Sequence, residues 1–237
     1  AILSVPLSLL IFSRAPAMGF LWGHWPSLFG QFFLIALFWS FTKFDLDKSY
    51  ILIGIFLSAV ILAHTANLVF ALFFILLFLL TQIFNKKFNF ELVKKILYIG
   101  IIASTLTLYY LIIFKYTWFV TQPYTFTIYP TWEGNPGFYI LDFKVILLFI
   151  IPGIILSLIT FKSKAHAATL ASFSMLLLGF SNYIGFDFRA FQIRFLWPIY
   201  LSFFFGFAVY QGLKFLTKKS NLIYAVILSL FFVLLFI

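Results

Sequence analysis

The sequence predicts an all-α fold: a polytopic transmembrane helical bundle of about nine spans with a long loop on its outer face. Two observations support this expectation. Of the 237 residues, 64% are hydrophobic and 9% are charged, and the mean hydropathy is +1.12, which lies far outside the range of soluble domains. The hydrophobic residues also form runs that approach the ~20 residues a helix needs to cross a bilayer. We therefore expect an integral membrane protein.

Each expected span is an apolar run bounded by polar or charged residues. Both terminal runs fall short of a full span, and the first has neither an initiator Met nor a basic leader. We therefore expect a single transmembrane domain, residues 1–237, truncated at both ends. The nine runs are 1–13, 28–42, 50–64, 66–84, 96–114, 144–161, 169–185, 195–216 and 222–237.

Eleven lysines and the three arginines occupy opposite gaps between these runs. Lysine-rich short loops resist translocation and so mark the cytoplasmic face of a polytopic protein. The three arginines, Arg14, Arg189 and Arg194, fall in the other gaps, where topology does not require positive charge. The alternation predicts a multi-pass protein of the cell membrane with cytoplasmic lysine-rich loops. The lysines that define this pattern are Lys43, Lys48, Lys86, Lys87, Lys94, Lys95, Lys162, Lys164, Lys214, Lys218 and Lys219.

One lysine-rich gap is longer than the others. Its sequence, NKKFNFELVKK (85–95), alternates basic and apolar residues, which is typical of a short amphipathic segment lying on the membrane interface. An ordinary cytoplasmic linker is the alternative that the same residues allow.

Composition and charge exclude several classes of function. The net charge of +10 comes mainly from lysines that the orientation explains, so nucleic acid is not an expected partner. The absence of cysteine excludes disulfides, thiolate metal sites and iron–sulfur clusters. Asp45 and Asp47 in FDLDK resemble a DxD metal motif, but they lie on the lysine side and are interpreted as solvated charges. A haem carrier would need paired axial ligands, and only His24 and His64 share a face.

The outer gap SNYIGFDFRAFQIR (181–194) carries two arginines beside one acid. A guanidinium presents several N–H donors in a fixed fork that suits phosphate. Arg189 and Arg194 are therefore candidate ligands for a lipid-linked phosphate or diphosphate. In the alternative interpretation, Arg189 pairs with Asp187 and Arg194 anchors the following helix at the headgroup layer.

His64 lies in the tight outer turn between the runs 50–64 and 66–84. An imidazole in this position can donate to a phosphate, titrate near neutral pH or ligate a metal. It can equally stabilise the C-terminal end of a helix, where a partly cationic ring meets the helix dipole.

Aromatic side chains are concentrated in the other long outer gaps, 14–30 and 115–144. Their faces stack on the C–H surfaces of sugars, and a carboxylate among them accepts hydroxyl protons, so they are candidates for a glycan-binding wall. Anchoring at the membrane interface is the alternative, since Trp and Tyr gather there. The residues are Arg14, Trp22, His24, Trp25, Pro26, Trp118, Tyr129, Trp132 and Glu133.

Acidic residues are scarce on the expected outer face, which limits the chemistry available there. They are Glu133, Asp142 and Asp187. A general base must come from these, from His24 or His64, or from a segment that precedes Ala1.

Three segments together suggest a family. They are GHWPSLFGQFFLIALF (23–38) after an outer loop, the hairpin ILAHTANLVFALFF (61–74), and FRAFQIRFLWP (188–198) before a late helix. Their order resembles that of the GT-C type glycosyltransferases, polytopic enzymes that use polyprenyl-phosphate or polyprenyl-diphosphate sugars on the outer face. The resemblance covers most of the chain as topology.

The resemblance implies transfer of a sugar from a polyprenyl-phosphate donor to a glycan, lipid or protein acceptor. Arg189 and Arg194 would hold the phosphate oxygens and stabilise charge as the sugar leaves, with His64 and Arg14 at the same phosphate. No nucleotide cofactor is required, because the donor is lipid-linked. Participation of a divalent cation stays open.

The resemblance also implies roles for acids and rings. Glu133 or Asp187 would orient or deprotonate the acceptor, and His24, Trp22 and Trp132 would bind the sugar or the acceptor. In this family a catalytic carboxylate commonly lies in the first outer loop, which here would precede the sequence.

Two other classes of function fit the sequence. A transporter or lipid flippase would use helix breaks such as Pro152–Gly153 and Pro198, although no expected span has an ionisable residue near its centre. A non-catalytic membrane subunit of a larger complex fits the shortage of acids.

Overall fold

The structure is a computed structural model that describes residues 25–64, 66–116, 136–140, 146–161, 166–184, 193–194 and 196–216. Every regular element in these ranges is helical, which confirms the predicted all-α class. The elements are α3 (Trp25–Phe41), α4 (Ser49–Ala63), α5 (Ala66–Phe84), α6 (Phe90–Phe114), α7 (Pro136–Ile140), α8 (Leu147–Ile159), α9 (His166–Leu178), the 3-10 helix η5 (Ser181–Ile184) and α11 (Trp197–Leu216).

Seven of the nine expected spans overlap a described helix, and the spans 1–13 and 222–237 lie outside the described residues. The span 66–84 has the same two ends as α5. The two largest boundary differences are the start of α6, at Phe90 instead of residue 96, and the end of α9, at Leu178 instead of residue 185. Both differences have a local cause.

The early start of α6 follows from its N-cap. Asn89 has an extended backbone, and its side chain accepts a hydrogen bond from the Leu92 amide at 2.9 Å. Glu91 lies in the first turn, where an acid meets the positive end of the helix dipole. The segment 85–95 is therefore a turn followed by the beginning of α6.

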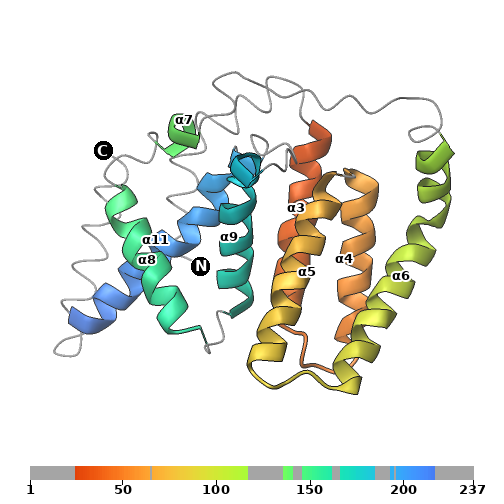
Figure 1. Cartoon of the computed structure of the whole chain (residues 1–237), viewed down its shortest axis with the longest axis horizontal. Helices are drawn as coiled ribbons and strands as arrows, with labels where there is room; N and C mark the ends of the chain where they lie inside the picture. Colours follow the sequence, from red (N-terminus) through yellow and green to blue (C-terminus); the bar gives the residue numbers. More distant parts are fainter. Residues whose placement is uncertain are drawn as a thin grey trace.

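The helices form two groups (Figure 1). In the first group, α3 packs against α4 and α5, and α4 packs against α5 and α6. In the second group, α8 and α9 each pack against α11. Helix α9 joins the two groups because it also packs against α5 and α3.

The turns of the bundle lie at two opposite ends (Figure 1). The α3–α4 turn (42–48) and the α5–α6 turn (85–89) lie at one end, which is called the lysine end because each turn carries two lysines. The α4–α5 turn at His64 and the 3-10 helix η5 lie at the opposite end, which is called the His64 end. Within the described residues, the turns that carry Lys43, Lys48, Lys86 and Lys87 thus lie at one end of the bundle.

Side-chain contacts hold the lysine end together. Lys95 Nζ donates to the carbonyl of Phe44 at 3.0 Å and to that of Leu46 at 3.3 Å, which ties α6 to the α3–α4 turn. Thr81 Oγ1 of α5 lies 3.0 Å from Nε2 of His166, the first residue of α9. The two helix groups are therefore connected at this end by a polar contact as well as by packing.

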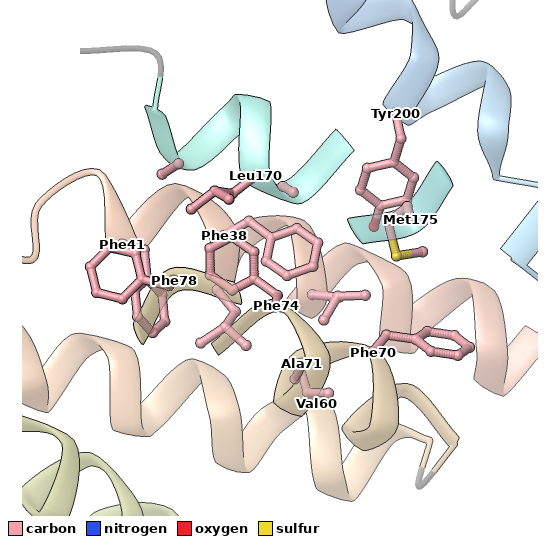
Figure 2. Packing of buried hydrophobic residues seen from close by; sticks show 14 of the residues in the cluster. Phe38, Phe41, Val60, Phe70, Ala71, Phe74, Phe78, Leu170, Met175 and Tyr200 are labelled. Atoms are coloured by element: carbon pink, nitrogen blue, oxygen red, sulfur yellow. The ribbon is translucent and has the colours of Figure 1, made fainter. Parts of the chain in front are cut away.

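Phenylalanine rings from α3 and α5 lie at the centre of the core (Figure 2). The ring centroids of Phe38 and Phe74 are 4.4 Å apart, and those of Phe41 and Phe78 are 5.0 Å apart. All four rings are buried, and side chains of α9 and α11 lie beside them. Ring pairs at these distances add attraction beyond the area that they bury.

The two prolines considered as helix breaks do not break a described helix. Helix α8 continues through Pro152. Pro198 lies in the first turn of α11, where a backbone N–H has no partner within the helix, so the proline removes no helical hydrogen bond. Beside Pro152, a Cβ on Gly153 would overlap the backbone carbonyl of Phe204. Gly153 therefore sets the close approach of α8 to α11, as small residues do at helix crossings in membranes.

Two of the described helices are long and apolar enough to cross a membrane, at Asn67–Phe84 of α5 and Phe90–Ile113 of α6. Only 28% and 17% of these stretches are buried, so most of their side chains are at least partly exposed. A core helix of a soluble protein would bury most of them, and water does not favour so large an apolar surface. These two helices favour insertion into a membrane.

Candidate functional site

Arg194 is a fully buried cation, and its contacts with Gly179 and Asn182 place it beside η5 at the His64 end. Its Nε–H donates to the carbonyl of Gly179 at 2.7 Å, and one of its terminal nitrogens donates to Oδ1 of Asn182. Buried arginines are rare because desolvating the charge is costly, and hydrogen bonds to the guanidinium offset that cost. The side chain is directed into the protein, which differs from the alternative interpretation of an anchor at the headgroup layer.

The end of α9 is held by this arginine and by a tryptophan one turn later. The indole N–H of Trp197 donates to the carbonyl of Met175 at 3.1 Å, and the amide of Gly179 donates to the same carbonyl at 3.1 Å. A Cβ on Gly179 would overlap the Trp197 ring. Orphan carbonyls at a helix end need such donors. Helix α9 therefore stops at Leu178 because Gly179, Arg194 and Trp197 close its last turn.

A chain of buried polar side chains joins three helices nearby. The hydroxyl of Tyr200 in α11 donates to Oε1 of Gln31 in α3 at 2.9 Å. Nε2 of Gln31 donates to Oδ1 of Asn67 in α5 at 3.0 Å. Gln31 and Asn67 are 2% and 0% exposed, so both amides are desolvated and depend on these bonds. The polar chain fixes the register of α3, α5 and α11.

His64 lies next to this polar chain. It is the C-cap of α4: its amide donates to the carbonyl of Val60 at 3.1 Å, and its own carbonyl accepts from the Asn67 amide at 3.0 Å. A Cβ on Gly30 would overlap the side-chain amide of Asn67 and lie 3.1 Å from Cβ of His64. Gly30 therefore lets α3 approach the α4–α5 turn, and it places the half-buried imidazole against α3.

Two of the predicted site residues can thus be located, Arg194 and His64, and both lie at the His64 end. Tyr200 follows Arg194 by six residues, Asn67 follows His64 by three, and Gln31 joins Tyr200 to Asn67 by hydrogen bonds. The other predicted site residues lie outside the described residues: Arg14, Trp22, His24, Trp132, Glu133, Asp187 and Arg189.

Several polar residues at this end were not predicted from the sequence. They are Gln31, Asn67, Asn182 and Tyr200. The first two carry a signal that was available, since an amide inside an apolar run must find a partner within the protein. The partner of each amide lies on another helix and is not visible in the sequence. Within the described ranges, no group of three or more His, Asp or Glu side chains is placed to hold a metal ion.

No protein-family model, curated protein or solved structure matches the chain. A functional assignment therefore rests on the residues and contacts described above.

Proposed function

We propose that this chain is a multi-pass membrane glycosyltransferase of about nine spans. Its lysine end faces the cytoplasm, and its His64 end takes a sugar from a polyprenyl-phosphate donor. The observation that carries the proposal is the burial of Arg194 at the end of the bundle opposite the lysine-rich turns. An ionisable group within a membrane protein is costly, and a functional role is the default expectation for it.

The apolar surface of the bundle supports the membrane part of the proposal. Leu97, Ile101, Leu108 and Tyr109 of α6 are all more than half exposed, in the middle of a 25-residue helix. Such side chains face lipid in a membrane protein. The two described lysine-rich turns lie at one end of the bundle, and the rule that lysine-rich loops stay in the cytoplasm would orient that end inward.

The contacts of Arg194 support a phosphate site in the segment that follows η5. Asn182 and Arg194 hold the two ends of this segment together, and residues 183–193 between them include Asp187 and Arg189. Pinning the ends of a loop removes much of the entropy cost of ordering it. A guanidinium in this segment suits a donor phosphate, because its N–H fork binds two oxygens at once.

In the proposed reaction, an acceptor hydroxyl oxygen forms a bond to the anomeric carbon of the sugar. The bond from that carbon to the phosphate oxygen breaks, and the polyprenyl phosphate leaves with the electron pair. Arg189 and Arg194, with Arg14 and His64, stabilise the negative charge on the leaving phosphate. Glu133 or Asp187 takes the proton of the hydroxyl group.

The binding of the sugar or the acceptor is assigned to residues that precede α3 and α7. His24, Trp22 and Trp132 provide ring faces for sugar C–H surfaces and a ring nitrogen for a hydroxyl group. The acceptor class is a glycan, a lipid or a protein. Membrane lipids surround the bundle, and no nucleic acid takes part. A requirement for a divalent cation is tested by adding a chelator to the assay.

The proposal is tested with the full chain in lipid nanodiscs and a panel of radiolabelled polyprenyl-phosphate hexoses and pentoses. Wild-type protein should release the labelled sugar from the donor. Replacing a phosphate-binding donor typically costs 100-fold or more in turnover, so Arg189→Lys should fall by about that factor. Lys214→Gln, at the end of α11, is the control that should keep full activity.

Full turnover in both Arg189→Lys and Arg194→Lys would contradict a phosphate site at these arginines. A protein that moves solute across sealed vesicles without any lipid-linked donor would instead be a transporter or flippase. A protein that is inactive in both assays but co-purifies with a membrane complex would be a non-catalytic subunit.

A further inference from the structure

The turn between α5 and α6 has an unusual residue at its tightest point. The amide of Lys86 donates to the carbonyl of Ile83 at 3.0 Å, and the amide of Lys87 donates to that of Gln82 at 2.8 Å. This pair of bonds is the Schellman motif, in which the residue at the position of Lys86 is left-handed and is usually glycine. Lys86 adopts that conformation with a φ of 57°. A lysine therefore occupies a position where the backbone conformation favours glycine.

The α3–α4 turn repeats this feature. Lys48 precedes α4 with a φ of 56°, and Lys48 and Lys86 are the two non-glycine residues with positive φ among the described residues. Both lie at the lysine end (Figure 1). Backbone strain persists where the surrounding structure or the function requires the residue. At both turns the residue with positive φ is a lysine.

Exposed aromatic rings lie beside these lysines in the α5–α6 turn. Phe84, Phe88 and Phe90 are 83%, 52% and 79% exposed, and they flank the exposed side chains of Lys86 and Lys87 in the sequence. Rings at this level fit the interface between headgroups and acyl chains, where lysines reach the phosphate layer. The turn therefore presents rings for the acyl boundary and two ammonium groups for the headgroups.

The other lysines nearby have protein contacts. Lys95 binds the carbonyls of the α3–α4 turn, and Lys94 Nζ lies 6.0 Å from the ring centroid of Tyr98. Glu91 is the acid nearest in sequence to the α5–α6 turn. With Lys43 and Lys48 against Asp45 and Asp47 in the other turn, positive charge predominates at this end.

We infer that the turn formed by residues 83–90 binds the headgroup of an anionic phospholipid in the leaflet at the lysine end. Lys86 and Lys87 contact the phosphodiester, and Phe84, Phe88 and Phe90 lie at the acyl boundary beneath it. Clusters of lysine next to a membrane span attract anionic lipids in this way. The inference rests on the membrane insertion in the proposed function but not on sugar transfer.

The inference is tested by native mass spectrometry of the full chain in detergent, titrated with dioleoyl phosphatidylglycerol or dioleoyl phosphatidylcholine. Wild-type protein should bind phosphatidylglycerol more tightly than phosphatidylcholine. The double variant Lys86→Gly/Lys87→Gln should bind phosphatidylglycerol about 25-fold more weakly, from the attraction of two lysines to an anionic surface. Glycine suits the left-handed position, so the variant keeps the turn while losing the charge.

Lys214→Gln, which removes one lysine from α11, is the matched control and should retain the wild-type preference. Equal binding of the two lipids by wild-type protein would overturn the inference, as would unchanged phosphatidylglycerol binding in the double variant. The measurement uses no sugar donor. Loss of glycosyltransfer with lipid preference intact would therefore contradict the proposed function alone.

Discussion

The hydroxyl of Tyr200 donates to the side-chain carbonyl of Gln31 at 2.9 Å across a sequence separation of 169 residues. This bond joins α11 to α3 and so connects the two helix groups at a point where both side chains are buried. The side-chain amide of Gln31 in turn donates a hydrogen bond to Oδ1 of Asn67 in α5. Three helices are thus held in one register by two hydrogen bonds.

Replacing Tyr200 by Phe should destabilise the bundle by about 1–2 kcal/mol, because it leaves Oε1 of Gln31 buried with its donor removed. The measurement is unfolding of the purified protein in mixed micelles, followed by circular dichroism. Tyr183→Phe is the control, since Tyr183 is 63% exposed and should change the free energy of unfolding by less than about 0.5 kcal/mol. Equal stability of wild type and Tyr200→Phe would show that the bond contributes nothing.

Arg194→Lys should lower the stability by about 2 kcal/mol, because an ammonium lacks the fork that reaches both Gly179 and Asn182. Asn182→Ala removes one partner of the guanidinium and should cost less. Thermal unfolding in detergent measures both. An Arg194→Lys protein as stable as wild type would contradict the role of this side chain in closing α9.

Measuring both turnover and stability of Arg194→Lys separates a role of Arg194 in catalysis from a role in folding. Turnover per folded molecule should fall in Arg194→Lys well beyond its loss of folded protein if the arginine also binds phosphate. A loss of turnover that matches the loss of folded protein would assign Arg194 to structure alone.

Gly153→Ala should weaken the packing of α8 on α11, because the added methyl group overlaps the Phe204 carbonyl, a backbone atom that cannot rotate away. We expect a loss of about 2 kcal/mol or more, as for other overpacked sites. Gly100→Ala is the matched control, since nothing lies within 4 Å of the added methyl group. Alanine favours a helix over glycine, so this control should be neutral or stabilised by up to about 1 kcal/mol. Equal destabilisation of the two variants would contradict a specific contact at Gly153.

The helices could be predicted from the sequence because apolar run length determines them in a chain of this composition. The run 66–84 lies between a His–Thr pair and an Asn–Lys–Lys turn, and the helix has the same two ends. The start of α6 at Phe90 could not be recognised, because it depends on the N-cap hydrogen bond of Asn89, which lies inside a charged segment. The end of α9 was equally hidden, since Arg194 and Trp197 close it from 15 or more residues away.

The candidate site could be predicted only in part, for a related reason. The sequence indicated Arg194 as a candidate because it is an arginine in an outer gap. It indicated His64 because that residue lies in a turn between two expected spans. The polar chain through Gln31, Asn67 and Tyr200 depends on which helix faces which, and apolar periodicity does not encode that choice. Tertiary pairing therefore decides the contacts that local pattern leaves open.

The absence of cysteine makes the orientation of the bundle directly measurable. Leu46→Cys in the α3–α4 turn and Tyr183→Cys in η5 introduce single thiols at side chains that are 58% and 63% exposed. The lysine end should be cytoplasmic, because lysine-rich loops resist translocation. In intact cells a membrane-impermeant maleimide should therefore label Tyr183→Cys, and it should label Leu46→Cys only after the membrane is permeabilised. The reverse labelling pattern would invert the topology, and labelling of both thiols in intact cells would contradict a spanning bundle with opposite ends on opposite sides.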